Sequence, residues 1–266
     1  MPHAIAPDVV AKLPYDLLGD FSPITLIGTS PLILFTDVAD DSTDLKTFLK
    51  TANSTKGGPP AIAHSSSGTI RHLVGKLFAQ RSKIKFNIVP YRGSTPALIG
   101  VSAGTVAAHF ATLASGAALL SAGKIRALAV TSNVRSGVPA SRDVPTFNEL
   151  GAKGLVLNQW WVLVAPITTP VNVLDKLPAD SLAALASAGE QARMSTLGVD
   201  LKGTIRDELR GFMRSGSERW QTVVRDIGLK PQQASFCLVL VSFQMIWQQG
   251  CPLHQMHHQF CGMDGK

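Results

Sequence analysis

Between residues 61 and 130, short apolar runs alternate with loops and with segments whose apolar residues recur at helical spacing. In the first helical segment, Leu73, Val74 and Leu77 fall on one face, which is typical of a helix packed on a sheet. Strands joined by helices favour a parallel arrangement, so the sequence predicts an α/β fold. Strands are expected at residues 61–64, 84–89, 106–110 and 125–130. Helices are expected at residues 70–78 and 112–121, and another helix is expected to begin at Pro96 with Thr95 as its N-cap.

Further elements are expected on both sides of this region. Residues 21–35 read as buried strand, and the polar run 40–44 supplies an N-cap for a helix through Leu49. The later elements are a short helix at residues 143–150, a strand at residues 160–164, and helices at residues 171–188, interrupted at Pro178, and 204–227.

The composition of the 266 residues is that of a globular protein with one large core or two modest lobes, since 45% are hydrophobic and 16% charged. The formal net charge of +7 favours anionic partners in general. Lys and Arg are dispersed along the sequence, however, without a helix-turn-helix, zinc-finger or basic–aromatic pattern. Nucleic acid is therefore not an expected partner.

Membrane-spanning helices need roughly 18–20 apolar residues, and the sequence offers no such segment. The longest apolar stretch, residues 236–247, is too short and contains Gln244. Direct membrane insertion is therefore not expected. Met1 is not followed by the basic start and apolar run of a signal peptide, so we expect a cytoplasmic location if Met1 is the true start.

Two loops rich in glycine and hydroxyl groups follow the first two predicted strands and lead into helices. Ligands of α/β sheets bind at the carboxyl ends of strands, where helix starts present unpaired N–H groups and positive dipole ends. Each loop therefore suits one carboxylate, although ordinary turn and N-cap chemistry uses the same residue types. The candidate ligand residues are Ser65, Ser66, Ser67, Gly68 and Thr69 in the first loop and Tyr91, Arg92, Gly93, Ser94 and Thr95 in the second.

Other side chains near these loops leave two interpretations open. Arg92 is either a counter-charge for a carboxylate or a solvated surface residue. Ser65 and His72 offer a nucleophile and a base, but the sequence lacks a Gly-x-Ser-x-Gly turn, so hydrolase chemistry is disfavoured. His72 is expected instead to take part in helix packing or in a hydrogen bond near the ligand.

The last thirty residues hold all three cysteines, so the rest of the fold is not expected to depend on disulfides or thiolate metal sites. The motif Cys251-x-x-His254-x-x-His257-His258-x-x-Cys261 has the residue types of a zinc site without the spacing of two separate knuckles. An out-of-frame or spliced extension, or disorder, is the competing interpretation. No metal and no cofactor are predicted.

A series of short motifs runs from residue 3 to residue 231. They are His3-Ala-Ile-Ala-Pro7, Lys12-Leu-Pro-Tyr-Asp16, Asp20-Phe-Ser-Pro-Ile-Thr25, Ile70-Arg-His-Leu73, Val89-Pro-Tyr-Arg-Gly-Ser-Thr-Pro-Ala-Leu98, Ala122-Gly-Lys-Ile-Arg-Ala-Leu-Ala-Val-Thr-Ser132 and Asp143-Val-Pro-Thr146. Their order and spacing resemble the Bug/TctC family, the solute receptors of tripartite tricarboxylate transporters.

The resemblance implies a two-lobed, type II periplasmic-binding-protein fold that holds a small carboxylate in the interlobe cleft, without catalysis. Lobe 1 would comprise residues 1–35 and 161–232, and lobe 2 residues 36–160. Residues 233–266 have no family counterpart and would form a disordered or irregular tail. The resemblance also implies a periplasmic location and the membrane subunits of a tripartite transporter as partners.

Within that cleft, the resemblance places the two loops, with Ala111 after the third strand and Trp160 at a crossover between lobes. Trp160 at a strand start is also compatible with a place in the core. Family members often carry an acidic residue where this chain has Ala111, so plain carboxylates are the expected ligands.

The amino end departs from the family pattern, because the opening strand and a Pro-Ala-Gly-Gly-type loop are not found before His3. The first lobe is therefore expected to be incomplete. A truncated remnant that binds nothing is therefore one alternative to a working receptor. A cytoplasmic ligand-sensing module is another, since the fold that the resemblance implies is shared with regulator domains.

Overall fold

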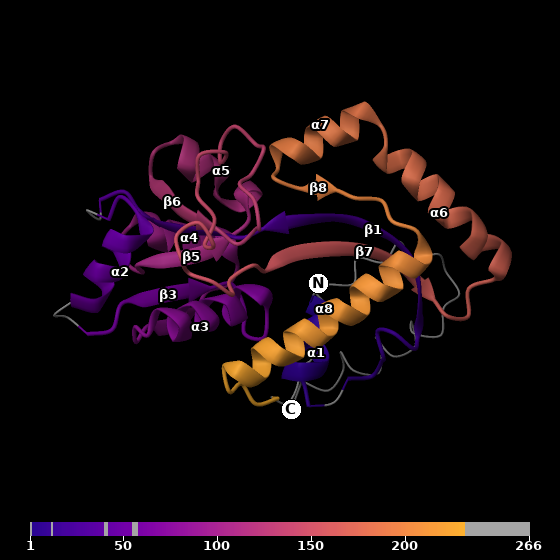
Figure 1. Ribbon diagram of the computed structural model, residues 1–266, viewed down its shortest axis with the longest axis horizontal. Helices are drawn as coiled ribbons and strands as arrows, with labels where there is room; N and C mark the ends of the chain where they lie inside the picture. Colours follow the sequence, from indigo (N-terminus) through magenta and orange to yellow (C-terminus); the bar gives the residue numbers. More distant parts are fainter. Residues whose placement is uncertain (1, 12, 40–41, 55–57, 232–266) are drawn as a thin grey trace, which may run out of the picture. The chain divides into compact units, whose positions relative to one another are not determined.

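The computed structural model describes residues 2–11, 13–39, 42–54 and 58–231, all within Met1–Gln233. Two β-sheets lie in this part of the chain, and helices pack against both (Figure 1). The predicted α/β fold class is confirmed. The predicted tail and its Cys251-to-Cys261 motif lie outside the described residues.

The larger sheet contains the strands predicted between residues 61 and 130. Its members are β2 (Ile33–Asp37), β3 (Ala61–His64), β4 (Asn87–Pro90), β5 (Ala108–Ala111) and β6 (Ile125–Val130). Their order is β4-β3-β5-β2-β6, and β3 pairs in parallel with β4 and β5, as the sequence predicts. β2 lies between β5 and β6 and runs antiparallel to both, so the sheet is mixed rather than wholly parallel.

Helices connect these strands along the chain. They are α2 (Leu45–Ser54), α3 (Ile70–Ser82), α4 (Ser94–Ser102) and α5 (Leu113–Ser121). α3 buries Leu73, Val74 and Leu77, the face that the spacing predicts. The predicted start of α4 at Pro96 is wrong by two residues, because Gly93 is the N-cap. Gly93 has a φ of 118°, a conformation that suits glycine, so the chain turns into the helix there.

The smaller sheet consists of β1 (Phe21–Pro31), β7 (Asn158–Pro166) and β8 (Asp200–Leu201), in the order β7-β1-β8. Both pairings are antiparallel. Leu32 alone separates β1 from β2, so the chain passes from one sheet to the other along an almost continuous extended segment.

Thr131 ties together the segments that pass between the sheets. Its hydroxyl accepts a hydrogen bond from the Leu32 N–H at 2.9 Å and donates one to the Leu157 carbonyl at 2.8 Å. Its backbone N–H donates to the Leu32 carbonyl at 2.9 Å, and its carbonyl accepts from the Leu157 N–H at 3.0 Å. All three residues are buried, so one side chain joins the end of β6 to both crossings.

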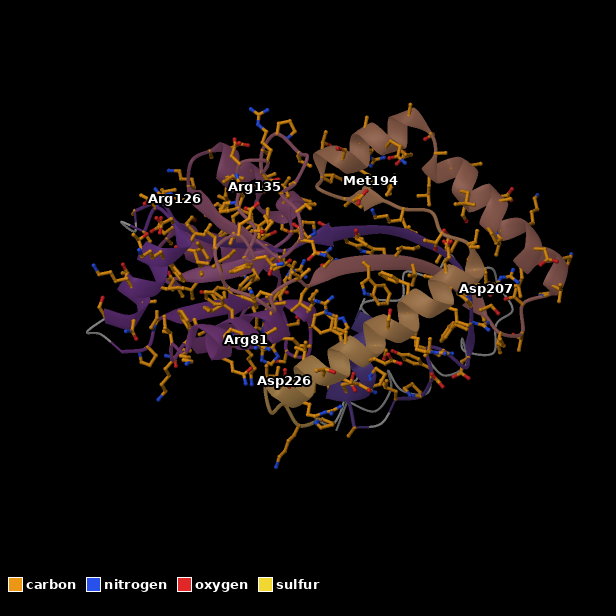
Figure 2. All side chains as sticks on the ribbon, viewed as in Figure 1. Arg81, Arg126, Arg135, Met194, Asp207 and Asp226 are labelled. Carbon is orange, nitrogen blue, oxygen red and sulfur yellow. The ribbon has the colours of Figure 1, made fainter. Side chains whose placement is uncertain are left out.

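The remaining described helices are α1 (Pro2–Val9), α6 (Val171–Leu185), α7 (Ala188–Thr196) and α8 (Arg206–Asp226). α8 contacts the smaller sheet, and its Phe212 ring packs edge-on against Trp160 with centroids 5.5 Å apart. At its other end, Asp226 faces Arg81 of α3 at 3.7 Å, and Gln80 donates to the Asp226 carbonyl at 2.8 Å (Figure 2). α8 thus connects the two sheets.

The prediction that Pro178 interrupts its helix is wrong, since α6 continues through it. Proline has no N–H, so the carbonyl four residues earlier, that of Leu174, lacks its helical donor. The Arg206 guanidinium at the start of α8 donates to this carbonyl at 2.5 Å. A long-range hydrogen bond therefore replaces the local one.

The short helix predicted at residues 143–150 is also wrong, because the structure has a single turn there. Thr146 and Glu149 exchange hydrogen bonds between side chain and backbone at 3.1 and 3.0 Å, the pattern of a capping box. Gly151 follows with a φ of 78° and ends the turn before a helix forms. The residues that start a helix are therefore present, but Gly151 ends the segment after one turn.

Candidate functional site

The two predicted loops start side by side at one edge of the larger sheet. β3 and β4 are parallel, and their last residues, His64 and Pro90, are partners in the register. The Tyr91 N–H donates to the His64 carbonyl at 2.8 Å, which extends this pairing into the second loop. β5 is the parallel neighbour of β3 on its other side, and Ala111 is its last residue.

The first loop, residues 65–69, is held by its own hydroxyl groups. Ser66 donates to the Ser65 carbonyl at 2.5 Å, and Thr69 donates to the Ser66 carbonyl at 2.7 Å. Ser66 and Ser67 are exposed, and Gly68 takes a φ of 72°. Thr69 is the N-cap of α3, yet no capping side chain is found there among the described residues. The N–H groups of the first helical turn are therefore left to other acceptors.

The second loop, residues 91–95, has a similar construction. Gly93 caps α4 by its conformation, again without a capping side chain among the residues that the structure describes. Arg92 and Thr95 are exposed, and Ser94 is half-buried. The Tyr91 ring lies against α4, since a Cβ atom at Gly100 would lie 2.7 Å from its hydroxyl oxygen. Tyr91 thus supports the helix with its ring.

Two other segments reach this edge of the sheet. A Cβ atom at Gly68 would lie 3.2 Å from the Val9 side chain, so the end of α1 contacts the first loop. A Cβ atom at Gly198, in the turn before β8, would lie 3.0 Å from Leu113, the first residue of α5. Segments attached to the smaller sheet therefore border the carboxyl edge of the larger sheet at two points.

Three buried histidines lie beneath the loops. The rings of His64 and His72 stack with centroids 4.5 Å apart. His72 Nδ1 accepts a hydrogen bond from the Gly68 N–H at 3.1 Å. His109 of β5 has Nδ1 2.8 Å from the Ala63 carbonyl and Nε2 3.4 Å from the Ser94 hydroxyl. In the described part of the chain, no group of His, Cys, Asp and Glu side chains is arranged to hold a metal ion.

The surroundings of these rings favour neutral imidazoles. Burial, followed by the nearby His64 and Lys76, lowers the pKa of His72 to about 4. Burial also lowers the pKa of His109 to about 4, with Arg71 and His64 adding to the effect and the Ala63 hydrogen bond opposing it. The pKa of His64 is lowered as well, mainly by burial. All three rings are therefore uncharged near pH 7.

The other two candidate residues have buried side chains. Ala111 is fully buried at the end of β5, where it pairs with Ile33 of β2. Trp160 is 4% exposed and packs against Phe212 in the core of the smaller sheet. Ala111 therefore ends the strand beside β3, whereas Trp160 belongs to the smaller sheet.

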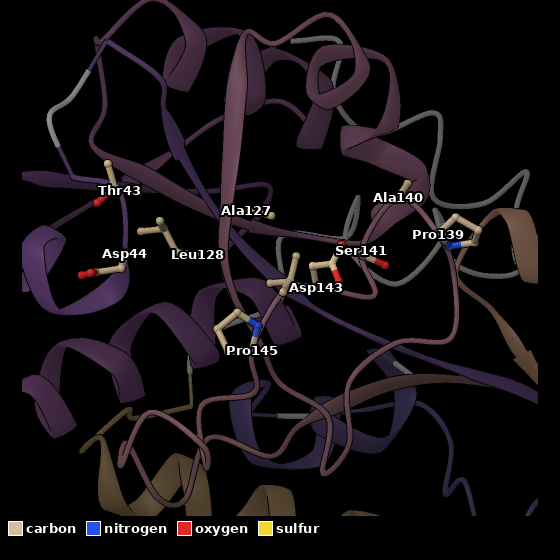
Figure 3. Close-up of a pocket in the computed structure, with 10 residues that line it drawn as sticks. Thr43, Asp44, Ala127, Leu128, Pro139, Ala140, Ser141, Asp143 and Pro145 are labelled. Carbon is tan, nitrogen blue, oxygen red and sulfur yellow. The ribbon is translucent and has the colours of Figure 1, made fainter.

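Two cavities of the described residues lie elsewhere on the molecule. One, of about 300 Å³, is lined by Asp44, Ser141 and Asp143 among others (Figure 3). The Asp44 carboxylate already accepts a hydrogen bond from the Thr47 N–H at 2.7 Å. The other cavity, of about 280 Å³, includes Trp160 and Phe212 in its wall. No residue of the two loops lines either cavity.

Comparison with known proteins identifies the class of molecule. Residues 1–229 match the family model described as the tripartite tricarboxylate transporter family receptor, TctC. The chain belongs to this family.

The TctC chain has curated relatives of moderate identity. BugT of Bordetella pertussis is 30% identical over 230 residues, which are 86% of this chain and 69% of BugT. A UPF0065 protein of Pseudomonas sp. strain P51 is 31% identical over 223 residues, 84% of this chain and 66% of that protein. The chain therefore spans about two thirds of the length of these relatives.

Solved structures of similar TctC-like proteins include two with carboxylate ligands. A protein of R. palustris with adipate has a TM-score of 0.78 at 27% identity, covering 87% of this chain and 76% of that one. MatC of Rhodopseudomonas palustris with bound malate has a TM-score of 0.72 at 26% identity, covering 84% and 75%. The periplasmic binding protein BugD has a TM-score of 0.77 at 25% identity, covering 87% and 77%. The predicted family and the predicted fold class are confirmed.

His109, which lies beneath the candidate loops, was not among the residues predicted from the sequence. His109 is a polar residue in an otherwise apolar strand, and that isolated polar position was the available signal.

None of the helices in the described ranges is both long and apolar enough to cross a membrane.

Proposed function

We propose that this chain is a non-catalytic receptor that binds a small mono- or dicarboxylate at the loops 65–69 and 91–95. The observation that carries the proposal is the side-by-side start of the two loops, each leading into a helix whose N-cap lacks a capping side chain among the described residues. Backbone N–H groups at such helix starts, with the positive dipole end behind them, are suited to carboxylate oxygens.

Charge and exposure agree with this role. The exposed hydroxyl-bearing residues Ser67 and Thr95 can donate to an oxygen, and the exposed Arg92 adds a positive charge beside them. The formal net charge of +7 favours the approach of an anion. The adipate- and malate-bound neighbours support the choice of carboxylates.

The proposal includes the division into lobes. Lobe 1 would comprise residues 1–35 and 161–232, and lobe 2 residues 36–160, closing on the ligand about the segments that pass between the sheets. The contact of Gly198 with Leu113 supports a cleft at this edge. Ala111 would contribute backbone at the cleft, and Trp160 would stand at the crossover.

We further propose that the receptor serves the membrane subunits of a tripartite transporter from the periplasm. Two structural neighbours are described as periplasmic, and the family name is that of the transporter receptor.

A receptor-derived protein that binds no carboxylate is the second candidate. It is favoured by one observation: two cavities among the described residues lie away from the loops. Carboxylate binding by the wild type separates the two candidates, and the Ser66→Glu variant tests the loop assignment, because a carboxylate in the first loop repels an anionic ligand. Ser54→Glu is the matched control, since Ser54 is exposed at the end of α2. It precedes the first residue of β3, whereas the first loop follows the last residue of that strand.

Isothermal titration calorimetry with malate, adipate and related acids provides the test. We expect saturable binding by the wild type and by Ser54→Glu, and at least about tenfold weaker binding by Ser66→Glu, which corresponds to about 1.4 kcal/mol. Equal affinities in all three proteins would refute the loop assignment. Absence of binding in the wild type at millimolar acid would favour the second candidate.

A further inference from the structure

We propose that His72 and His109 are positioning residues, each of which holds one ligand loop through a hydrogen bond to a ring nitrogen. The proposal rests on the function proposed above and adds to it the residues that fix the two loops. Both histidines are buried under the loops rather than exposed to a ligand, so they act through other groups.

The first loop is held by His72. Its Nδ1 lies 3.1 Å from the Gly68 nitrogen, and an N–H can donate only to a ring nitrogen that carries no proton. Gly68 sits between Ser67 and Thr69 in a left-handed conformation, so this bond sets the direction of the peptide there. The exposed face of the loop and the start of α3 are thereby fixed relative to each other.

The second loop is held by His109. The Ala63 carbonyl 2.8 Å away is an acceptor only, so Nδ1 carries the proton of the neutral ring. Nε2 is then the acceptor, and it lies 3.4 Å from the Ser94 hydroxyl. The ring thus connects β3, through Ala63, with the first residue of α4.

The charged and titratable neighbours of both rings oppose their protonation. His72 faces His64 across the ring stack and Lys76 one turn along α3. His109 faces Arg71 and His64. These neighbours are cationic or become so, and burial acts in the same direction, which keeps both rings in the neutral form that makes the two bonds.

Substitutions at His72 test the first bond. His72→Phe keeps the ring stack and removes the acceptor, whereas His72→Asn places an amide oxygen near the position of Nδ1. In the full chain without ligand, we expect the Gly68 amide to exchange about fivefold to tenfold faster in His72→Phe, measured by NMR. The adipate Kd should rise by a similar factor, and His72→Asn should restore both values to within about threefold.

Several outcomes would overturn the proposal. Unchanged Gly68 exchange in His72→Phe would mean that the hydrogen bond does not hold the loop. An unchanged adipate Kd would mean that the bond does not serve the ligand site, whatever the exchange rate. If His72→Phe does not fold, His72→Gln replaces it, because the longer side chain does not place an oxygen at the Nδ1 position. Equal Gly68 exchange rates and equal adipate Kd values in His72→Gln and His72→Asn would then refute the proposal.

His109 is tested in the same way. His109→Asn keeps a donor for the Ala63 carbonyl and removes the acceptor for Ser94, so the adipate Kd should rise about threefold to tenfold. A Kd equal to that of the wild type would refute the role of His109. If the wild type binds no carboxylate, the proposed function fails, while Gly68 exchange still decides whether His72 holds the loop.

Discussion

The hydroxyl of Thr131 is the group whose removal should most clearly disturb the passage between the two sheets. Thr131→Val keeps the shape of the side chain and deletes the oxygen. The Leu32 N–H loses its acceptor at 2.9 Å, and the Leu157 carbonyl loses its donor at 2.8 Å. Leu32 is fully buried and Leu157 is 2% exposed, so water cannot readily replace the lost partner.

The expected loss of stability follows from these two groups. A buried donor or acceptor left unpaired costs about 1–3 kcal/mol, so the two together should cost about 2–6 kcal/mol. Thr131→Ser is the matched control, because it keeps the hydroxyl and loses one methyl group, worth about 1 kcal/mol. The difference between the two variants isolates the hydroxyl.

Thermal and urea unfolding followed by circular dichroism measure this difference. A domain of this size loses about 2–4 °C of Tm per kcal/mol, so Thr131→Val should melt at least about 4 °C below the wild type, and below Thr131→Ser. The reasoning would be wrong if Val and Ser destabilised equally, or if Thr131→Val stayed within about 0.5 kcal/mol of the wild type.

Two further predictions concern the histidines and α6. The pKa values of His72 and His109 lie near 4 in the folded protein, below the unfolded value of 6.5, so the unfolded chain binds more protons between these limits. The free energy of unfolding, measured with urea, should therefore be highest above pH 6.5 and should fall as the pH drops toward 4. At pH 5 the expected loss is about 2 kcal/mol for each histidine, and His72→Phe should remove its share of this pH dependence. Arg206→Met should cost about 1–2 kcal/mol, because the Leu174 carbonyl loses its donor, and Pro178→Ala should recover much of that loss by restoring a helical N–H.

The controls for these two predictions are internal. An unfolding free energy that is constant from pH 7 to pH 5, or a dependence that survives in His72→Phe unchanged, would contradict the assignment of neutral buried rings. For α6, the two substitutions form a double-mutant cycle, and a coupling of about 1 kcal/mol is expected. Strictly additive effects of Arg206→Met and Pro178→Ala would show that the guanidinium does not replace the missing helical donor.

Much of the larger sheet was predictable because its signals are local. The strands β3 and β6 were placed at their observed bounds, and the buried face of α3 followed from apolar spacing. The antiparallel insertion of β2 between β5 and β6 was not predictable, because it depends on pairing between segments far apart in the sequence. The continuation of α6 through Pro178 likewise depends on a distant residue, Arg206.

The candidate site was predictable to a similar extent. Glycine and hydroxyl patterns indicated both loops, and parallel pairing explains why the loops start together. The start of α4 was misplaced because proline at Pro96 is a good first helical residue, whereas the Gly93 conformation that decides the start is not written in a local pattern. His109 lies 45 positions after His64 in the sequence, and only the sheet order brings the two under the same loops.

Calorimetric titration of the full chain with malate and adipate tests the proposed carboxylate binding most directly. We predict saturable heat with at least one small carboxylate, and a loss of affinity of at least about tenfold in Ser66→Glu but not in Ser54→Glu. A folded wild-type protein, verified by circular dichroism, that gives no saturable heat with any carboxylate at millimolar concentration would contradict it.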